Sequence, residues 1–187
     1  MQPLTAGKPT KFTRRNALRL ITAGAAASLI DARWIVPGRL SITRHDRVLK
    51  QLPPALDGLR LGLLADFHFR PEQDAELLGK VVAQVHREKL DLIALVHEPD
   101  YFDTMTAHRE IMLQLSGHSH GGQCRVPLIG YAPKTVKYGT KYVEGAFTNG
   151  SSNPFVTRGV GTTGSRVRFA YPPELAVLSL RAASPTG

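Results

Sequence analysis

The sequence predicts an α/β domain in which β-sheets pack face to face, and three observations support this fold class. A helical segment lies between two short apolar runs near the start of the domain, and a third strand-like run follows at 109–116. From Gly121 onward, glycine, proline and β-branched residues dominate and favour further strands. The chain has 187 residues, 42% of them hydrophobic, which suits one such domain with an additional leader segment.

The N-terminal segment, residues 1–36, predicts an export signal or a membrane anchor. A basic stretch precedes the mostly small or apolar run 17–30, which is shorter than the roughly 20 residues of a spanning helix. The heptapeptide TRRNALR at 13–19 is similar to the twin-arginine export consensus, with Arg14 and Arg15 as the pair. The alternative is an amphipathic or disordered basic tail. We therefore expect the twin-arginine export machinery as a partner, and a periplasmic location or an anchor on the outer side of the cytoplasmic membrane.

The leader also explains most of the basic charge of the chain. The formal net charge is +9, and residues 1–19 hold +5 of it because they contain no acidic side chain. No run of Lys and Arg interleaved with aromatic residues occurs, so the sequence argues against a nucleic-acid partner. One cysteine, Cys124, excludes an intrachain disulfide and a cysteine-based zinc cluster.

The domain at 37–187 begins with strands and one helix in alternation. Apolar runs or alternating patterns predict strands at 39–53, 58–69, 91–96, 109–116 and 174–181. Helical spacing of leucine and valine predicts a helix over 71–90, with Pro71 in its first turn. Residues 98–108 predict a loop with room for one helical turn, and two further strands are expected around the turn 149–153.

Side chains that bind metals gather where the predicted strands end. Asp66 and His68 lie two residues apart at such an end, so both can point the same way. His118 and His120 have the same spacing, and neighbouring glycines allow a tight turn there; His97 follows the next strand. One carboxylate and four imidazoles suit Mn, Fe or Zn better than Mg or Ca. Two such ions close together would bind a phosphate and supply a hydroxide.

Three other histidines lack this context. His86 lies within the predicted helix, and His45 and His108 have no ligand-like partner in the pattern. We expect these three to be surface residues or hydrogen-bonded residues of the core.

Several motifs resemble the calcineurin-like metallophosphoesterases: LLADFH, LVHEPDYFD, LSGHSHGGQCRVPLIG, and KYGTKYVEGAF followed by VTRGVGTTGSRVRFAYPPEL. The similarity covers nearly all of 40–181 and is greatest to the exported, membrane-associated bacterial branch. The resemblance implies a central β-sandwich flanked by helices, in an α/β/β/α arrangement. It also implies hydrolysis of a small-molecule or lipid phosphomonoester or phosphodiester by a metal-bound hydroxide.

The resemblance assigns five metal ligands: Asp66, His68 and His120 to a first metal ion, and His97 and His118 to a second. One or two divalent ions (Mn, Fe or Zn) are therefore the expected cofactors.

Two motifs of this family are missing from the sequence. Family members have a strand ending in Gly-Asp, whose carboxylate bridges the metals, and a later Gly-Asn-His-Asp, whose histidine assists the leaving group; neither occurs here. The run 91–103 resembles the start of the first strand joined to the end of a much later one, near 93–94. We therefore expect a domain reduced by a missing internal segment, with the leaving-group histidine absent.

This junction has consequences for the site. If 91–96 pairs beside the first strand, His97 or Glu98 is expected near the position of the missing bridge. The alternative function is a catalytically impaired relative that binds metal or phosphate without useful turnover.

Overall fold

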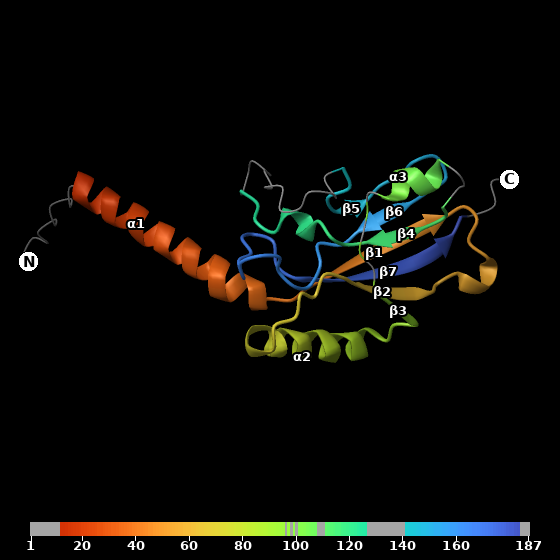
Figure 1. Ribbon diagram of the computed structural model, residues 1–187, viewed down its shortest axis with the longest axis horizontal. Coiled ribbons are helices and arrows are strands. Elements are labelled where there is room, and N and C mark those ends of the chain that lie inside the picture. Colours follow the sequence, from red (N-terminus) through yellow and green to blue (C-terminus); the bar gives the residue numbers. More distant parts are fainter. Residues whose placement is uncertain are drawn as a thin grey trace, which may run out of the picture.

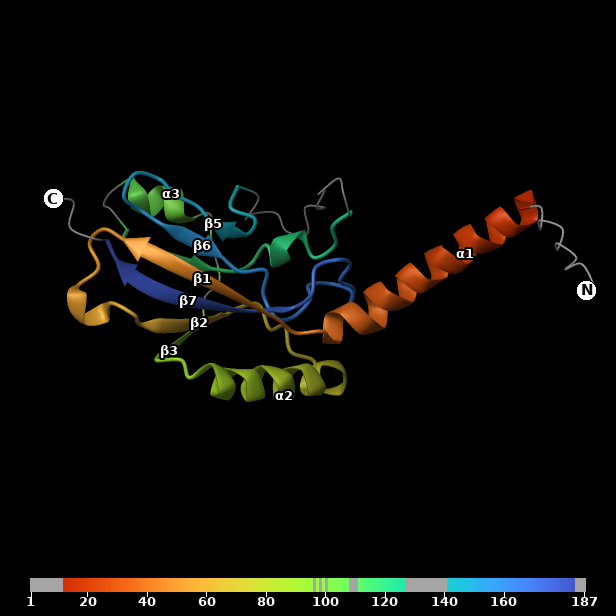
Figure 2. The ribbon, with the colours of Figure 1, turned by 180° about the vertical axis from the view of Figure 1, so that it is seen from behind.

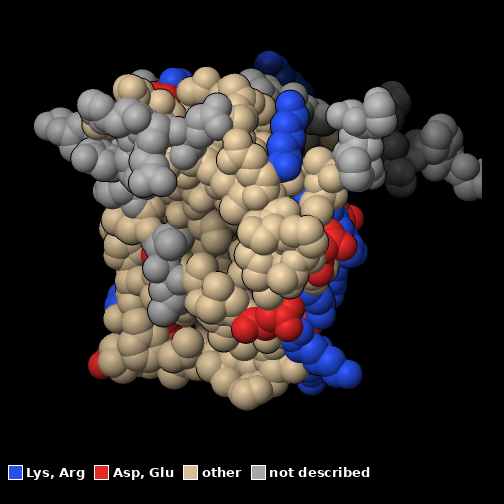
Figure 3. Space-filling model, turned by 90° about the vertical axis from the view of Figure 1, so that its right-hand side faces the viewer, with Lys and Arg blue, Asp and Glu red and all other residues tan. Residues whose placement is uncertain are grey.

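The computed structural model describes residues 12–95, 97, 99, 101–107, 111–126 and 141–183. Two β-sheets pack face to face, one helix covers the outer face of each sheet, and a long N-terminal helix projects away from this sandwich (Figures 1 and 2). The predicted α/β fold with a β-sandwich flanked by helices is confirmed. The end of the sandwich away from the N-terminal helix is mostly uncharged (Figure 3).

The first sheet has four strands in the order β1-β7-β2-β3. Their bounds are Ser41–Leu49 for β1, Glu174–Ala182 for β7, Arg60–Leu64 for β2 and Leu92–Leu95 for β3. The pairs β1–β7 and β2–β3 are parallel, and β7 runs antiparallel to β2. The strand predicted at 91–96 is β3, and it lies beside the strand that leads to Asp66, which is the pairing on which the expected position of His97 depends.

The second sheet has three short strands in the order β4-β6-β5. Their bounds are Gln114–Ser116 for β4, Pro154–Val156 for β6 and Gly145–Ala146 for β5. The strands expected around the turn 149–153 are β5 and β6, which pair antiparallel, and an isolated bridge joins Asn149 to Ser152. The strand predicted at 109–116 is confirmed only at its end, since 111–113 are irregular.

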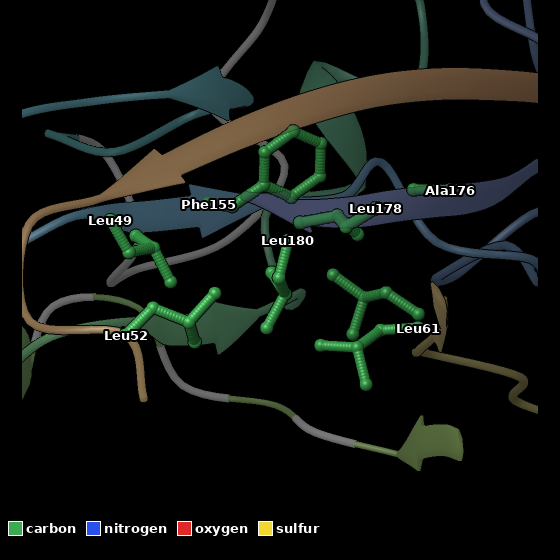
Figure 4. Packing of buried hydrophobic residues seen from close by; sticks show 8 residues of the cluster. Leu49, Leu52, Leu61, Phe155, Ala176, Leu178 and Leu180 are labelled. Carbon is green, nitrogen blue, oxygen red and sulfur yellow. The ribbon is translucent and has the colours of Figure 1, made fainter. Parts of the chain in front are cut away.

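The main hydrophobic core fills the space between the two sheets (Figure 4). Phe155 of β6 is 1% exposed and packs against apolar side chains of the first sheet. The buried members of this cluster are Leu49, Leu52, Leu61, Leu63, Phe155, Ala176, Leu178 and Leu180. Because side chains alternate along a strand, β7 presents Leu175 and Val177 to the opposite face, toward the helix α2.

Two helices cover the outer faces. Helix α2 (Pro71–Glu88) buries Leu77 and Val81 against the first sheet and ends where Lys89 turns into the left-handed conformation, with φ of 49°. Helix α3 (Tyr101–Thr106), in the predicted loop, buries Phe102 against the second sheet. These two helices complete the four layers.

The N-terminal helix is longer than the sequence predicts. Helix α1 (Arg14–Ile30) continues through a π-helical turn, Asp31–Ile35, and a 3-10 turn, Val36–Gly38. The 25 residues Arg14–Gly38 are long and apolar enough to cross a membrane by length and composition, a criterion that a signal sequence also meets. The helix extends beyond the apolar run 17–30 because it does not stop at Asp31 and Arg33, and its role as an export signal or a membrane anchor stays a prediction.

Asp74 ties the start of α2 to the loop that precedes β7. Its carboxylate accepts hydrogen bonds from Arg70 Nε at 3.0 Å and Arg166 Nε at 3.2 Å. Burial acts to raise the pKa of Asp74, but these hydrogen bonds outweigh it, so the pKa lies below its ordinary value of 3.8.

This lowered pKa predicts a pH-dependent contribution to stability. The contribution is fully present above the unfolded pKa and is lost as the pH falls through the lower folded pKa. We expect Asp74→Asn to reduce the free energy of unfolding by about 2 kcal/mol at neutral pH, and by less as the pH falls toward about 3. Urea denaturation of both proteins across this range measures the difference. A difference that stays constant with pH contradicts the assignment.

Candidate functional site

Asp66 and His68 lie in the loop that follows β2, and both have left-handed backbones, with φ of 56° and 39°. Such angles are uncommon outside glycine, cost about 1–3 kcal/mol each, and cluster at functional sites. Two backbone hydrogen bonds of 2.9 Å hold the loop, from Val160 N to Ala65 O and from Gly161 N to Asp66 O. The segment before β7 therefore fixes the position of Asp66.

Three glycines allow the backbone to approach Asp66 closely. A Cβ atom on Gly117 would lie 2.6 Å from Asp66 Oδ2, and one on Gly159 would lie 2.9 Å from Asp66 Cβ. A Cβ on Gly161 would overlap the carbonyl oxygen of Phe67. The glycines of the two motifs GHSHGG and TRGVG thus form one cradle around a single buried carboxylate.

His97 and His118 form a hydrogen-bonded chain with Asp66. The parallel register that pairs Leu64 with Leu95 carries Asp66 and His97 to the same end of their strands. His97 Nδ1 lies 2.8 Å from Asp66 Oδ1, and His118 Nδ1 lies 2.9 Å from His97 Nε2. The backbone N–H of His118 donates to Asp66 Oδ2 at 2.5 Å. His97 therefore lies beside Asp66, as the pairing of β3 with β2 predicts; Glu98 is outside the described residues.

His120 is the most deeply buried of the five predicted ligands. It is 1% exposed, and its ring stacks on that of His68 with centroids 5.1 Å apart. Burial, with smaller contributions from the charges of Arg168 and His68, lowers the pKa of His120 to about 3. The ring is therefore neutral at physiological pH, and neutral imidazole is the form that binds metals. His118 and His120 also have left-handed backbones, with φ of 67° and 51°.

Arg168 is a site residue that the sequence did not reveal. Its guanidinium is completely buried and lies 3.5 Å from His120 Nδ1. It donates to four backbone carbonyls at 2.7–3.1 Å, those of Arg158, Gly159, Gly161 and Tyr171. Burial lowers the pKa of Arg168 to about 10, so it remains charged at neutral pH. An arginine in a polar, glycine-rich segment is ordinarily a surface residue. The one signal in the sequence that could have identified Arg168 is its position within the motif RVRFAYPPEL.

The five predicted ligands lie at one end of the sandwich and match a first-row divalent metal in donor chemistry. Among the described residues, however, no three His, Cys, Asp or Glu side chains are spaced to hold one metal ion as they stand. Both Asp66 oxygens already have partners, His97 Nδ1 and the His118 amide. Metal binding at these residues therefore requires their side chains to change position.

The remaining histidines do not join this site. The ring of His45 packs edge-to-face on Phe155 in the core, with centroids 4.8 Å apart, and His86 is exposed on α2. His108 lies outside the described residues. The expectation of a core or surface role agrees with the two that are described.

Comparison with known proteins gives partial matches to phosphoesterases. The chain is 43% identical over 95 residues to the uncharacterized metallophosphoesterase YkuE of Bacillus subtilis, an alignment that covers 50% of this chain and 32% of YkuE. It is 39% identical over 93 residues to the phosphodiesterase YaeI of Escherichia coli, covering 49% and 33%. An uncharacterized metallophosphoesterase of Helicobacter pylori strain J99 is 32% identical over 127 residues, covering 67% and 33%.

No protein-family model and no solved structure matches the chain. The aligned part spans about a third of each curated relative. These partial matches support the metallophosphoesterase family, and the names of the relatives indicate a phosphoesterase hydrolase.

Proposed function

We propose that this chain is a metal-dependent phosphoesterase that hydrolyses a phosphomonoester or phosphodiester outside the cytoplasm. One observation carries the proposal. A buried carboxylate and four histidines, four of these five residues on left-handed backbone, lie together at one end of a metallophosphoesterase-like sandwich. Three relatives with names of that activity support the same assignment.

In this proposal Asp66, His68 and His120 hold one divalent ion, and His97 and His118 face a second position. A bound divalent cation lowers the pKa of a coordinated water and neutralises charge on the phosphoryl oxygens. The chain itself contributes orientation: the glycine cradle fixes the Asp66 carboxylate. Burial keeps the His120 ring neutral and in place.

We also propose that an internal segment is missing near 93–94. Within the described residues β3 is an edge strand, and two of its large apolar side chains, Leu92 and Ile93, are 55% and 45% exposed. Large apolar side chains on an open edge are typical of a strand that normally has a neighbour. His97 lies close to Asp66, but an imidazole carries no negative charge and cannot screen two adjacent cations as a bridging carboxylate would. This favours one metal ion over two.

The export signal is likewise part of the proposal. Helix α1 bears exposed apolar side chains such as Leu18, Ile21 and Leu29. Basic residues precede it, which favours a cytoplasmic N-terminus and a domain on the outer side. Retained rather than cleaved, the leader would hold the enzyme at the membrane surface.

Hydrolysis of nitrophenyl phosphate, as the monoester and the diester, tests the proposed activity. We expect the full chain with added manganese to hydrolyse at least one of the two and a chelator to stop it. Because His120 is a proposed ligand, His120→Ala is expected to lower the rate by about 100-fold or more. His86→Ala removes an exposed histidine on α2 and serves as the matched control, with an unchanged rate. A rate unchanged in His120→Ala contradicts the site.

The second candidate function is binding of metal or phosphate without turnover. It is favoured by the absence of the Gly-Asp and Gly-Asn-His-Asp motifs from the sequence. Retention of metal that depends on His120, with no hydrolysis of either ester, would select this candidate.

A further inference from the structure

A cavity of about 360 Å³ lies between the end of the N-terminal helix and α2. We call it the basal pocket. Residues of the segment 38–42 line one side, and the stripe 80–87 of α2 lines the other. Ala83, Gln84 and Arg87 lie three, four and seven residues after Lys80, so all four share one face of the helix. The side chains of Leu77 and Val81 beside this stripe are buried, which fixes the orientation of α2.

The basal pocket is lined by three cationic side chains. Lys80 Nζ donates to the Gly38 carbonyl at 3.2 Å and pairs with the exposed Glu76 at 2.7 Å, which leaves a third ammonium N–H. The Arg39 and Arg87 side chains are exposed and have no hydrogen bond or ion pair within the described part of the chain. The pocket therefore offers cationic donors to an anion.

Besides Glu76, a second acidic residue, Glu88, lies near the pocket, and its charge is already neutralised by arginines. Glu88, at the end of α2, is buried, and its two oxygens accept hydrogen bonds from Arg44 at 2.5 Å and Arg60 at 3.1 Å. Its charge does not cancel those of Arg39 and Arg87.

The position of the basal pocket relates it to a membrane. The apolar segment Arg14–Gly38 ends at Gly38, which lines the pocket. Just before this end, Trp34 is 62% exposed, and the guanidinium of Arg33 lies 5.3 Å from its ring centroid. Exposed aromatic and cationic residues at the end of an apolar helix are typical of the interface between lipid and water. Figures 1 and 2 show α1 projecting away from the body, with this end at the sandwich.

We propose that the basal pocket binds the phosphate group of an anionic phospholipid headgroup. Guanidinium groups match the geometry of phosphate oxygens, and the ammonium of Lys80 adds a third donor. Inorganic phosphate shares this chemistry, but the exposed apolar side chains of Trp34 and Ile35, a few residues before Gly38 in the chain, favour a lipid. The inference rests on the leader being retained as an anchor and is independent of hydrolysis. Binding there turns the α2 side of the sandwich toward the membrane.

Energy transfer from Trp34, the one tryptophan of the chain, to a labelled lipid tests this proposal. The full chain is placed in phosphatidylcholine nanodiscs that contain a small fraction of either dansyl-phosphatidylglycerol or dansyl-phosphatidylcholine. We expect greater transfer to the anionic lipid. Each cation near the surface contributes to this preference, so Lys80→Gln with Arg87→Gln should lower it about tenfold.

A matched double variant controls for net charge. Lys50→Gln with Arg181→Gln removes two exposed cations near the ends of β1 and β7, opposite the end where the leader enters. It should keep the full preference for the anionic lipid. Far-UV circular dichroism is expected to be the same for both variants and the wild type.

Four outcomes would overturn the proposal. Equal transfer to the two labelled lipids in the wild type is the first, and an unchanged preference in the Lys80 and Arg87 variant is the second. In the third, millimolar inorganic phosphate abolishes the preference and binds the lipid-free chain in calorimetry, which identifies free phosphate as the ligand. In the fourth, the chain does not enter phosphatidylcholine nanodiscs, which removes the membrane premise without affecting the hydrolysis assay.

Discussion

Arg168→Ala is expected to destabilise the domain by about 3–5 kcal/mol, the largest effect of any single substitution considered for this chain. The guanidinium supplies hydrogen bonds to the carbonyls of Arg158, Gly159, Gly161 and Tyr171. Without it, the carbonyls of Arg158, Gly161 and Tyr171 lose their donor, while that of Gly159 keeps the Glu174 N–H. Each unsatisfied buried acceptor costs about 1–3 kcal/mol. The loop that holds Asp66 then loses its fixed position, so we expect the proposed hydrolysis to be lost too.

Thermal unfolding of the full chain in mild detergent measures this effect. For a chain of this size, we expect the midpoint to fall by roughly 10 °C. Arg168→Lys is expected to recover only part of the loss, because one ammonium cannot serve acceptors arranged around a planar guanidinium. Arg181→Ala removes an exposed arginine and is the control, with a change within about 0.5 kcal/mol. A loss below about 1 kcal/mol for Arg168→Ala would show that the buried cation is not essential to the loop.

Gly161→Ala is expected to damage stability and the site together. The added Cβ would overlap the Phe67 carbonyl oxygen and lie 2.5 Å from the Asp66 carbonyl oxygen. Both are backbone atoms, so the strain is relieved only by moving the chain between Asp66 and His68. We expect a loss of about 3 kcal/mol and a fall in metal affinity of about tenfold or more.

The matched control for this substitution is Gly79→Ala, because no atom lies within 4 Å of a Cβ placed at this position of α2. Replacing a glycine in a helix is expected to stabilise the domain by about 0.5–1 kcal/mol. Chemical denaturation of the two variants and the wild type compares them directly. If Gly161→Ala behaves like Gly79→Ala, the close approach of this loop to Asp66 is wrong.

The sequence predicted the elements whose periodicity is strong. Helix α2 starts at Pro71 as expected, and β7 carries the apolar pattern of a strand buried on both faces. The sequence also identified Asp66, His97 and His118, because each follows a strand or precedes a tight glycine turn. These three residues lie in direct contact in the structure. Local pattern was sufficient where one element alone determines the position of a side chain.

The sequence did not predict features that depend on contacts between distant segments. Arg168 is buried because carbonyls of the loop 158–161 and of Tyr171 surround it, a contact that no local pattern shows. The length of the N-terminal helix was missed because Asp31 and Arg33 interrupt its apolar run without ending the helix.

The metal content of the purified chain decides whether Asp66, His68 and His120 hold a metal ion. After loading with manganese or zinc and removal of free metal, elemental analysis counts the ions retained by the wild type and by His120→Ala. We expect about one ion per wild-type chain, held by Asp66, His68 and His120, and a large loss in the variant. Retention of far less than one ion by the wild type would contradict this ligand set. Equal retention by the wild type and His120→Ala would contradict it as well.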